Sequence, residues 1–127
     1  GRSVVISGDS LVTDKIVEIS DGADVVLHDA MELQLVQTAE NVLRNAGATR
    51  TATVLHDIQD YHATTEDLQR LVDEAEIGLL ALYHLVPAPR NAMAVAAFNR
   101  SIPEGALITE DAMVISLPSG SEDILID

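Results

Sequence analysis

An apolar run that ends in Gly-Asp constrains the fold of this chain more than any other feature. The run is Val4-Val5-Ile6-Ser7-Gly8-Asp9-Ser10, and its β-branched residues predict a buried strand over residues 3–7. The chain then turns toward a helix, which places Asp9 at the carboxyl end of the strand. In open α/β sheets, ligands bind outside the carboxyl ends of the strands. Asp9 is therefore a candidate metal ligand or catalytic carboxylate.

A second apolar run, Leu79–Tyr83, ends in the same way on His84. We expect both strands to end at one edge of a sheet, with the Asp9 carboxylate and the His84 imidazole within roughly 3–6 Å of each other. At that separation the two side chains can share a metal ion, whose ligand atoms lie about 2.0–2.2 Å away. Each residue taken singly also fits a structural role, Asp9 as a turn or helix-cap acid and His84 as a hydrogen-bonded core histidine.

Strand and helix patterns alternate through residue 99, which predicts an α/β fold with layered packing. The expected strands cover residues 3–7, 24–28 and 79–83, and the expected helices cover 12–20, 32–46, 64–75 and 90–99, with a short helix carrying His56 within 51–61. Leu107-Ile108 and Met113–Leu117 are expected to form a terminal hairpin that turns at Glu110-Asp111. The polar, acidic residues 118–127 are expected to form a tail, which separates a domain over residues 1–117 from a tail over residues 118–127.

The composition excludes several classes of function. The formal net charge is −14, and the seven basic residues are scattered along the sequence, so we expect no nucleic-acid partner. No run approaches the roughly 18–20 apolar residues that span a bilayer, and the absence of cysteine excludes thiolate metal ligands. There is no basic-then-apolar leader, which favours a cytoplasmic location, although Gly1 is not expected to be a natural start and leaves a removed leader open.

Two further polar residues stand at the ends of expected elements. Asp29 follows the second strand, and His62 precedes a helix that begins at Thr64. Carboxylate and imidazole groups at the open edge of a sheet suit Zn²⁺ or a similar cation, and a histidine beside an acid can donate a proton to a leaving group. Each also fits a structural role, Asp29 as a helix cap and His62 as an ordinary residue before one. The roles of His28 and His56 stay open.

These segments resemble, in their order and wording, the C-terminal half of the metallo-β-lactamase-fold hydrolases, in the branch of ribonuclease Z and arylsulfatase-like enzymes. The run ending in Ser7-Gly8-Asp9-Ser10 is similar to the family's strand ending in Ser/Thr-Gly-Asp-Thr/Ser. His28-Asp29-Ala30-Met31 is similar to its His-Glu-Ala-Thr segment, with Asp29 in place of Glu. Tyr61-His62-Ala63-Thr64-Thr65-Glu66 is similar to Tyr-His-Thr-Ser/Thr-Pro-Glu, and Leu82–Pro87 resembles the strand whose final histidine, here His84, ligates the second metal.

The resemblance implies half of an αββα sandwich, with a mixed sheet, flanking helices and a C-terminal hairpin. It implies that Asp9 bridges two divalent metal ions, zinc in the first place, and that His84 ligates one of them. His62 would contact the substrate or protonate the leaving group, with Asp29 as its partner. The implied reaction is hydrolysis of an ester, phosphodiester or related bond in a small-molecule substrate by a metal-bound hydroxide.

The family's first ligand cluster, His-x-His-x-Asp-His, does not occur in these 127 residues. We therefore expect the fragment alone to be inactive and to bind zinc weakly. Apolar strands such as residues 25–27 and 79–82 need cover on both faces, so we expect a partner, either a missing N-terminal half or a second copy of this chain. The alternative function, from another class, is a non-catalytic half-domain that pairs with another chain or binds a ligand.

Overall fold

The computed structural model describes all residues from 1 to 127. The helices and strands follow one another as β1 (Val4–Ile6), α1 (Asp14–Ser20), β2 (Val25–Met31), α2 (Leu33–Asn45), α3 (Thr49–Asp57), a 3₁₀ turn (Ile58–Asp60), α4 (Thr65–Glu74), β3 (Leu79–Val86), α5 (Ala92–Ser101), β4 (Leu107–Ile108), β5 (Ile115–Ser116) and β6 (Leu125–Ile126). The alternation confirms the predicted α/β class. The ambiguous region 51–61 is helical, because α3 runs through it to Asp57.

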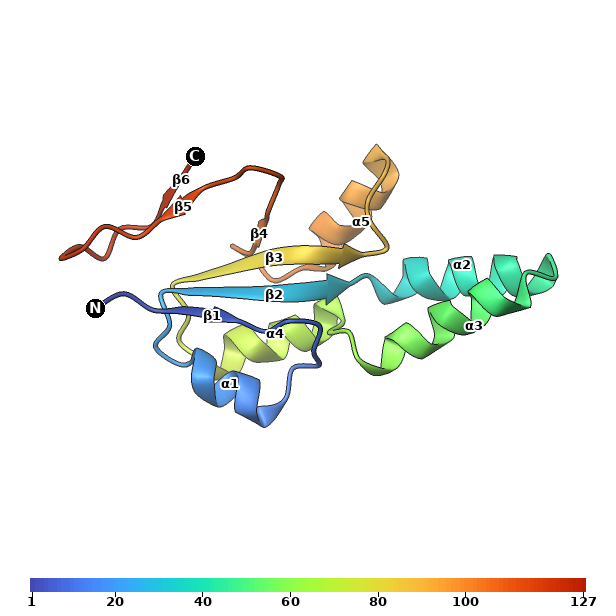
Figure 1. Ribbon diagram of the computed structural model, residues 1–127, viewed down its shortest axis with the longest axis horizontal. Coiled ribbons are helices and arrows are strands. Elements are labelled where there is room, and N and C mark those ends of the chain that lie inside the picture. Colours follow the sequence, from blue (N-terminus) through green and yellow to red (C-terminus); the bar gives the residue numbers. More distant parts are fainter.

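The first four strands form one parallel sheet in the order β1-β2-β3-β4 (Figure 1). Parallel neighbours need crossover connections, which helices supply in each case: α1 between β1 and β2, the helices from α2 to α4 between β2 and β3, and α5 between β3 and β4. The sheet is entirely parallel, whereas the sequence predicted a mixed one. The difference arises at β4, which was expected to enter a hairpin and instead pairs in parallel with β3.

The hydrophobic core lies between one face of this sheet and its helices. Val26, Leu80 and Leu82 from the strands meet Leu68 and Leu71 of α4 in one buried cluster, which Phe98 of α5 completes. Residues of α1 pack against the same cluster. Burial of this aliphatic surface is the main favourable term in folding, and it holds the carboxyl ends of the strands in register.

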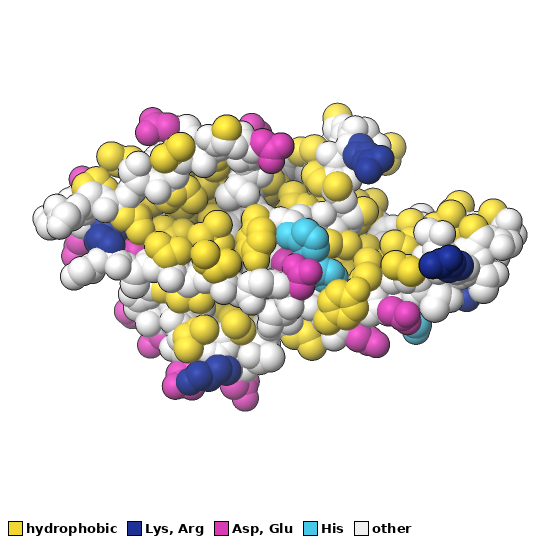
Figure 2. Space-filling view, viewed as in Figure 1, with side chains coloured by type: hydrophobic (Ala, Val, Ile, Leu, Met, Phe, Trp, Pro, Cys, Tyr) yellow, Lys and Arg dark blue, Asp and Glu magenta, His cyan; other side chains and the backbone are white.

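The opposite face of the sheet is partly open. Side chains alternate along a strand, so Val4 and Ile6 of β1 point away from the core, and they are 51% and 67% exposed. The prediction of a buried first strand was wrong, because β1 is an edge strand and the chain supplies no cover for this face of it. Figure 2 shows apolar side chains gathered over the strands. A contiguous apolar patch is uncommon on a monomeric protein and marks a contact surface.

The C-terminal hairpin exists, but other strands form it than expected. β5 pairs antiparallel with β6, so Leu107-Ile108 is not a hairpin strand and Glu110-Asp111 is not the hairpin turn. Residues 118–127, expected to form a tail, supply the loop and the second strand of this hairpin.

Arg2 fastens the hairpin loop to the rest of the molecule. Its guanidinium donates hydrogen bonds to the backbone oxygens of Ser121 and Asp123, and its Nε lies 2.8 Å from the carboxylate of Asp24. The Arg2 side chain is only 13% exposed. One partly buried guanidinium therefore joins the first residues of the chain to its last ones.

Helices α2 and α3 form a helical arm that projects beyond the carboxyl ends of the strands (Figure 1). Glu40 of α2 ties the arm together, because it binds Arg44 at 2.8 Å and Gln59 at 3.0 Å. None of the helices is sufficiently long and apolar to cross a membrane.

Candidate metal site

The site is built at the carboxyl ends of β1 and β3, where irregular backbone turns the chain outward. Gly8 has a φ of 66°, a left-handed conformation that glycine adopts without strain. The loop after β1 can therefore turn at once and present Asp9. On β3, His84 has a φ of 46° and is the extra residue in the pairing with β2, since Asp29 pairs with Tyr83 and Ala30 with Leu85. Such a bulge re-aims a side chain and is common beside active sites.

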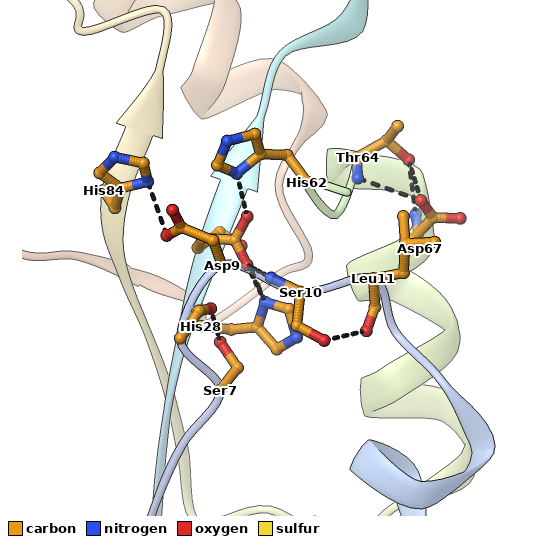
Figure 3. Close-up of polar contacts among 11 residues, drawn as sticks. Ser7, Asp9, Ser10, Leu11, His28, His62, Thr64, Asp67 and His84 are labelled. Carbon is orange, nitrogen blue, oxygen red and sulfur yellow. Dashed lines mark hydrogen bonds and ion pairs between the residues drawn. The ribbon is translucent and has the colours of Figure 1, made fainter. Parts of the chain in front are cut away.

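The Asp9 and His84 side chains meet as the sequence predicts. Oδ1 of Asp9 lies 3.1 Å from Nδ1 of His84, within the expected 3–6 Å (Figure 3). Both side chains are about half exposed, 51% and 48% respectively. Two groups that can ligate a metal therefore face each other at the edge of the sheet while staying open to solvent.

His62 joins this pair from the loop before α4. Its position follows from two local restraints. The amide of Met31 donates to the carbonyl of Ala63 at 2.7 Å, which ties the loop to the end of β2, and Thr64 with Asp67 forms a capping box that starts α4. The His62 side chain is 4% exposed, and its ring centroid lies 5.3 Å from that of His84. One ligand atom each from Asp9, His62 and His84 lies within 4.8 Å of the others.

The Asp29 carboxylate stands behind His62 and is fully buried. Its Oδ2 lies 2.7 Å from Nδ1 of His62, while its Oδ1 receives the Ser10 amide at 3.3 Å and lies 3.0 Å from Nδ1 of His28. Burial alone raises the pKa of Asp29, but the hydrogen bonds from His28, His62 and Ser10 outweigh burial and hold that pKa below its ordinary value. Asp29 is therefore ionised at neutral pH and accepts the Nδ1 proton of His62.

Asp29 stands at the position where the metallo-β-lactamase-fold hydrolases that this sequence resembles have glutamate. The aspartate side chain is shorter, but it still reaches His62. An ionised carboxylate can only accept hydrogen bonds, so Nδ1 of His62 carries the proton and Nε2 is left free. This arrangement, with a carboxylate behind an imidazole, fixes the orientation and the tautomer of the ring. It suits either metal ligation or proton transfer at Nε2.

Two parts of the site were not foreseen from the sequence. His28 was left without a role, yet its ring is fully buried against Asp29, and the backbone amide of Ser10 also binds Asp29. The one available signal was the direct adjacency of His28 and Asp29. His56 lies apart from the site, on the helical arm, where it is 66% exposed and 3.4 Å from Glu40.

The site also sits within an uneven distribution of charge. Residues 33–56 and 77–103 contain one acid, Glu40, and four of the seven basic residues, Arg44, Arg50, Arg90 and Arg100. These residues belong to the helical arm and to α5 with its preceding loop, which flank the carboxyl ends of the strands (Figure 2). The segments at this end of the sheet therefore contain fewer acids than the rest of the sequence.

A groove adjoins His84 on the side of α5. Its volume is about 670 Å³, and its walls come from the end of β3, from α5 and from the segment after β4. Half of its ten lining residues are apolar, and the lining also includes two acids. Among the lining residues are Tyr83, Leu85, Val95, Ile108, Glu110 and Asp111. The groove has the size of a small-molecule site and opens beside the candidate metal ligands.

Comparison with known proteins gives a distant and partial similarity to ribonuclease Z, of the metallo-β-lactamase superfamily. The chain is 28% identical over 89 residues to ribonuclease Z of Mycobacterium tuberculosis (strain H37Rv), covering 69% of this chain and 28% of that protein. It is 31% identical over 88 residues to ribonuclease Z of Mycolicibacterium paratuberculosis, with 69% and 28% covered. For ribonuclease Z of Mycolicibacterium gilvum the values are 28% over 112 residues, with 83% and 35% covered.

The matched region spans about a third or less of the length of these relatives. No protein-family model matches the chain.

Proposed function

We propose that this chain is the C-terminal half of a metal-dependent hydrolase of the metallo-β-lactamase superfamily. One observation carries the proposal: Asp9, His62 and His84 bring three ligand atoms within 4.8 Å of one another, with the buried Asp29 behind His62. The distant similarity to ribonuclease Z and the order of the sequence motifs support it. The chemistry of the donor set supports it too, because imidazole and carboxylate are common zinc ligands.

In this proposal Asp9 and His84 hold the metal. Both are half exposed, as ligands must be if other ligands are to complete the site. Zinc bound there would activate a water molecule for attack on an ester. His62 takes up a proton at Nε2 from the attacking water and passes it to the leaving group, or it binds the substrate, while Asp29 keeps its Nδ1 protonated. The groove beside His84, half of whose lining residues are apolar, takes the organic part of a small-molecule substrate.

The remaining ligands have to come from outside these 127 residues. We propose that a missing N-terminal half supplies them and covers the open face of the sheet, where Val4 and Ile6 are exposed. Covering this face would complete a two-sheet sandwich. A second copy of the chain is the other occupant of this face. Sedimentation velocity of the purified chain, alone and with the upstream polypeptide, distinguishes the two, since self-association of the chain alone favours the second copy.

The catalytic roles are tested with the chain joined to the polypeptide encoded upstream. The substrates are chromogenic phosphodiester, sulfate ester and carboxylic ester compounds, and the variants are His62→Ala, His84→Ala and the exposed control His56→Ala. We expect His62→Ala to lower turnover roughly 10²–10⁴-fold with metal content intact, and His84→Ala to lose metal. Equal loss of metal in both would show that His62 is a ligand and not a proton donor.

The second candidate function is a non-catalytic half-domain that pairs with another chain or binds a ligand. It is favoured by the absence of any His-x-His cluster in the chain. Hydrolysis of none of these esters by the completed protein, with zinc bound, would favour this function over the enzyme.

A further inference from the structure

The most unusual buried group in the molecule is the His28 ring. His28 lies on β2 with no exposed surface. Its Nδ1 lies 2.9 Å from the backbone oxygen of Asp29 and 3.0 Å from Oδ1 of the same residue. Its Nε2 is buried and has no hydrogen-bond partner. The rest of the strand is apolar apart from Asp29, so nothing in the packing of β2 calls for an imidazole at this position.

The surroundings of His28 determine which ring nitrogen carries the proton. Both groups near Nδ1 are acceptors, a carbonyl oxygen and an ionised carboxylate, so Nδ1 must be the donor. A proton on Nε2 as well would place an unpaired N–H in the core, which is unfavourable. His28 is therefore a neutral imidazole that donates from Nδ1. Its unpaired Nε2 lone pair is a cost that packing alone does not explain.

The donor at His28 acts on the orientation of the Asp29 carboxylate. Oδ1 is occupied by His28 and by the Ser10 amide, which leaves Oδ2 to face His62 at 2.7 Å. His28 and His62 therefore bind different oxygens of this carboxylate. Without the donor at His28, only the longer bond from the Ser10 amide, at 3.3 Å, would hold Oδ1, so His62 would face a less firmly held acceptor for its Nδ1 proton.

We propose that His28 is a positioning residue, whose Nδ1–H holds the Asp29 carboxylate so that His62 is kept in its Nδ1-protonated tautomer with Nε2 free for the site. This inference rests on the proposed function for its chemical purpose, but the tautomer of His62 is a property of the chain itself. Hydrogen-bond partners of this kind commonly change activity or metal affinity by about 10–100-fold when they are removed.

The test compares His28→Leu with His28→Asn. Leucine keeps an apolar side chain of similar size and removes the donor, whereas the side-chain amide nitrogen of asparagine can take the place of Nδ1. Circular dichroism verifies that each variant folds. Long-range ¹⁵N–¹H correlation spectra of the 127-residue chain at pH 8, with ¹⁵N-labelled histidine, then report the tautomer of His62. His56→Asn, on the distant arm, is the matched control.

We expect His62 in the Nδ1–H form in the wild-type chain, in His28→Asn and in His56→Asn, and a mixture of both tautomers in His28→Leu. A folded His28→Leu chain that keeps the Nδ1–H form as fully as the wild type overturns the proposal. A mixture in folded His28→Asn overturns it as well, because the donor would then not be the cause.

A second measurement separates this inference from the proposed function. In the completed enzyme, His28→Leu should lower kcat by about 10–100-fold with little change in KM, and His28→Asn should restore most of the loss. If the spectra behave as expected while the wild-type enzyme hydrolyses no ester, the positioning role stands and the hydrolase proposal fails.

Discussion

Asp29 and Asp9 are both aspartates that face a histidine, and the structure predicts very different consequences of removing them. The Asp29 carboxylate is fully buried and serves three donors, on His62, His28 and Ser10. The Asp9 carboxylate is 51% exposed and meets only His84, itself 48% exposed. Replacement of each by alanine therefore compares a buried and an exposed Asp–His pair within one site.

The size of the effect follows from burial. In Asp29→Ala the Nδ1 proton of His62 loses its acceptor inside the protein, and an unsatisfied buried donor costs about 1–3 kcal/mol. Loss of the charge-assisted bonds to His28 and Ser10 adds to this cost, and relief of the buried carboxylate's own desolvation offsets part of it. We expect Asp29→Ala to lower the free energy of unfolding by about 2–4 kcal/mol. Asp9→Ala should change it by less than about 1 kcal/mol, as for exposed ion pairs.

Urea unfolding at pH 7, followed by circular dichroism, measures both changes. Zinc binding should show the opposite order, since Asp9→Ala removes a proposed ligand and Asp29→Ala leaves the ligands in place in the folded protein. Equal destabilisation by the two substitutions would refute the reasoning, because it would mean that the Asp29–His62 contact is no more buried than the Asp9–His84 contact.

The pH dependence of this stability has a defined sign. The pKa of Asp29 is lowered in the folded state, so its contribution is present above the unfolded pKa, which is about 4, and is lost as the pH falls through the lower folded value. The difference in unfolding free energy between the wild type and Asp29→Asn should therefore shrink as the pH is lowered from 7 to below 4. A difference that grows on acidification would contradict the lowered pKa.

Three further substitutions test other parts of the fold. Gly78→Ala should lower the free energy of unfolding by about 1–3 kcal/mol, because an added Cβ would lie 2.5 Å from the backbone oxygen of Asp24. Gly1→Ala is the control, since a Cβ at Gly1 meets nothing within 4 Å. Equal stability of the two variants in thermal melts would contradict the close approach at Gly78. Arg2→Ala should release the β5–β6 hairpin, seen as faster hydrogen exchange of the Val114 amide, which donates to the Asp127 oxygen at 2.9 Å, and not in α4. Unchanged exchange at Val114 would show that Arg2 does not fasten the loop. Thr64→Ala removes the cap of α4 and should cost about 0.5–2 kcal/mol in urea unfolding, and an unchanged midpoint would argue against the capping box.

The strand ends of the site could be predicted from the sequence, because parallel strands with crossover helices end at one edge of a sheet. That rule places Asp9 and His84 at the same edge, and the turn at Gly8 and the bulge at His84 bring them together across β2. His62 follows no strand; its place before a helix marked it as a candidate, and its resemblance to a known motif gave it a role. Its actual position depends on the contact between Met31 and Ala63, which joins residues far apart in the sequence.

Other features lay beyond sequence patterns for definable reasons. The strands Leu107–Ile108 and Ile115–Ser116 have two residues each. Such short strands show no alternation of apolar and polar residues that could indicate their partners. The predicted hairpin therefore joined the wrong pair of strands. The apolar run at Val4–Ile6 is equally typical of a central strand and of an edge strand that awaits a partner. The bulge at His84 could not be predicted from the sequence, because the residue with the positive φ is a histidine and not the glycine that usually indicates such a conformation.

The net charge of the whole chain also gave no indication of how the charged residues are distributed. The net charge of −14 argues against a nucleic-acid partner, but residues 77–103 contain no acid at all. A sum over the chain carries no information on which residues lie around the site, whereas the fold brings α5 and the helical arm to the same end of the sheet.

Zinc titration of the purified chain by isothermal calorimetry tests the central claim most directly. The wild-type chain should bind a single zinc ion weakly, because Asp9 and His84 supply only part of a ligand set. His84→Ala should abolish this binding, and His56→Ala, on the exposed arm, should leave it unchanged. Binding of the same strength in His84→Ala, or two tightly bound zinc ions in the wild-type chain, would contradict the assignment of these residues as one half of a metal centre.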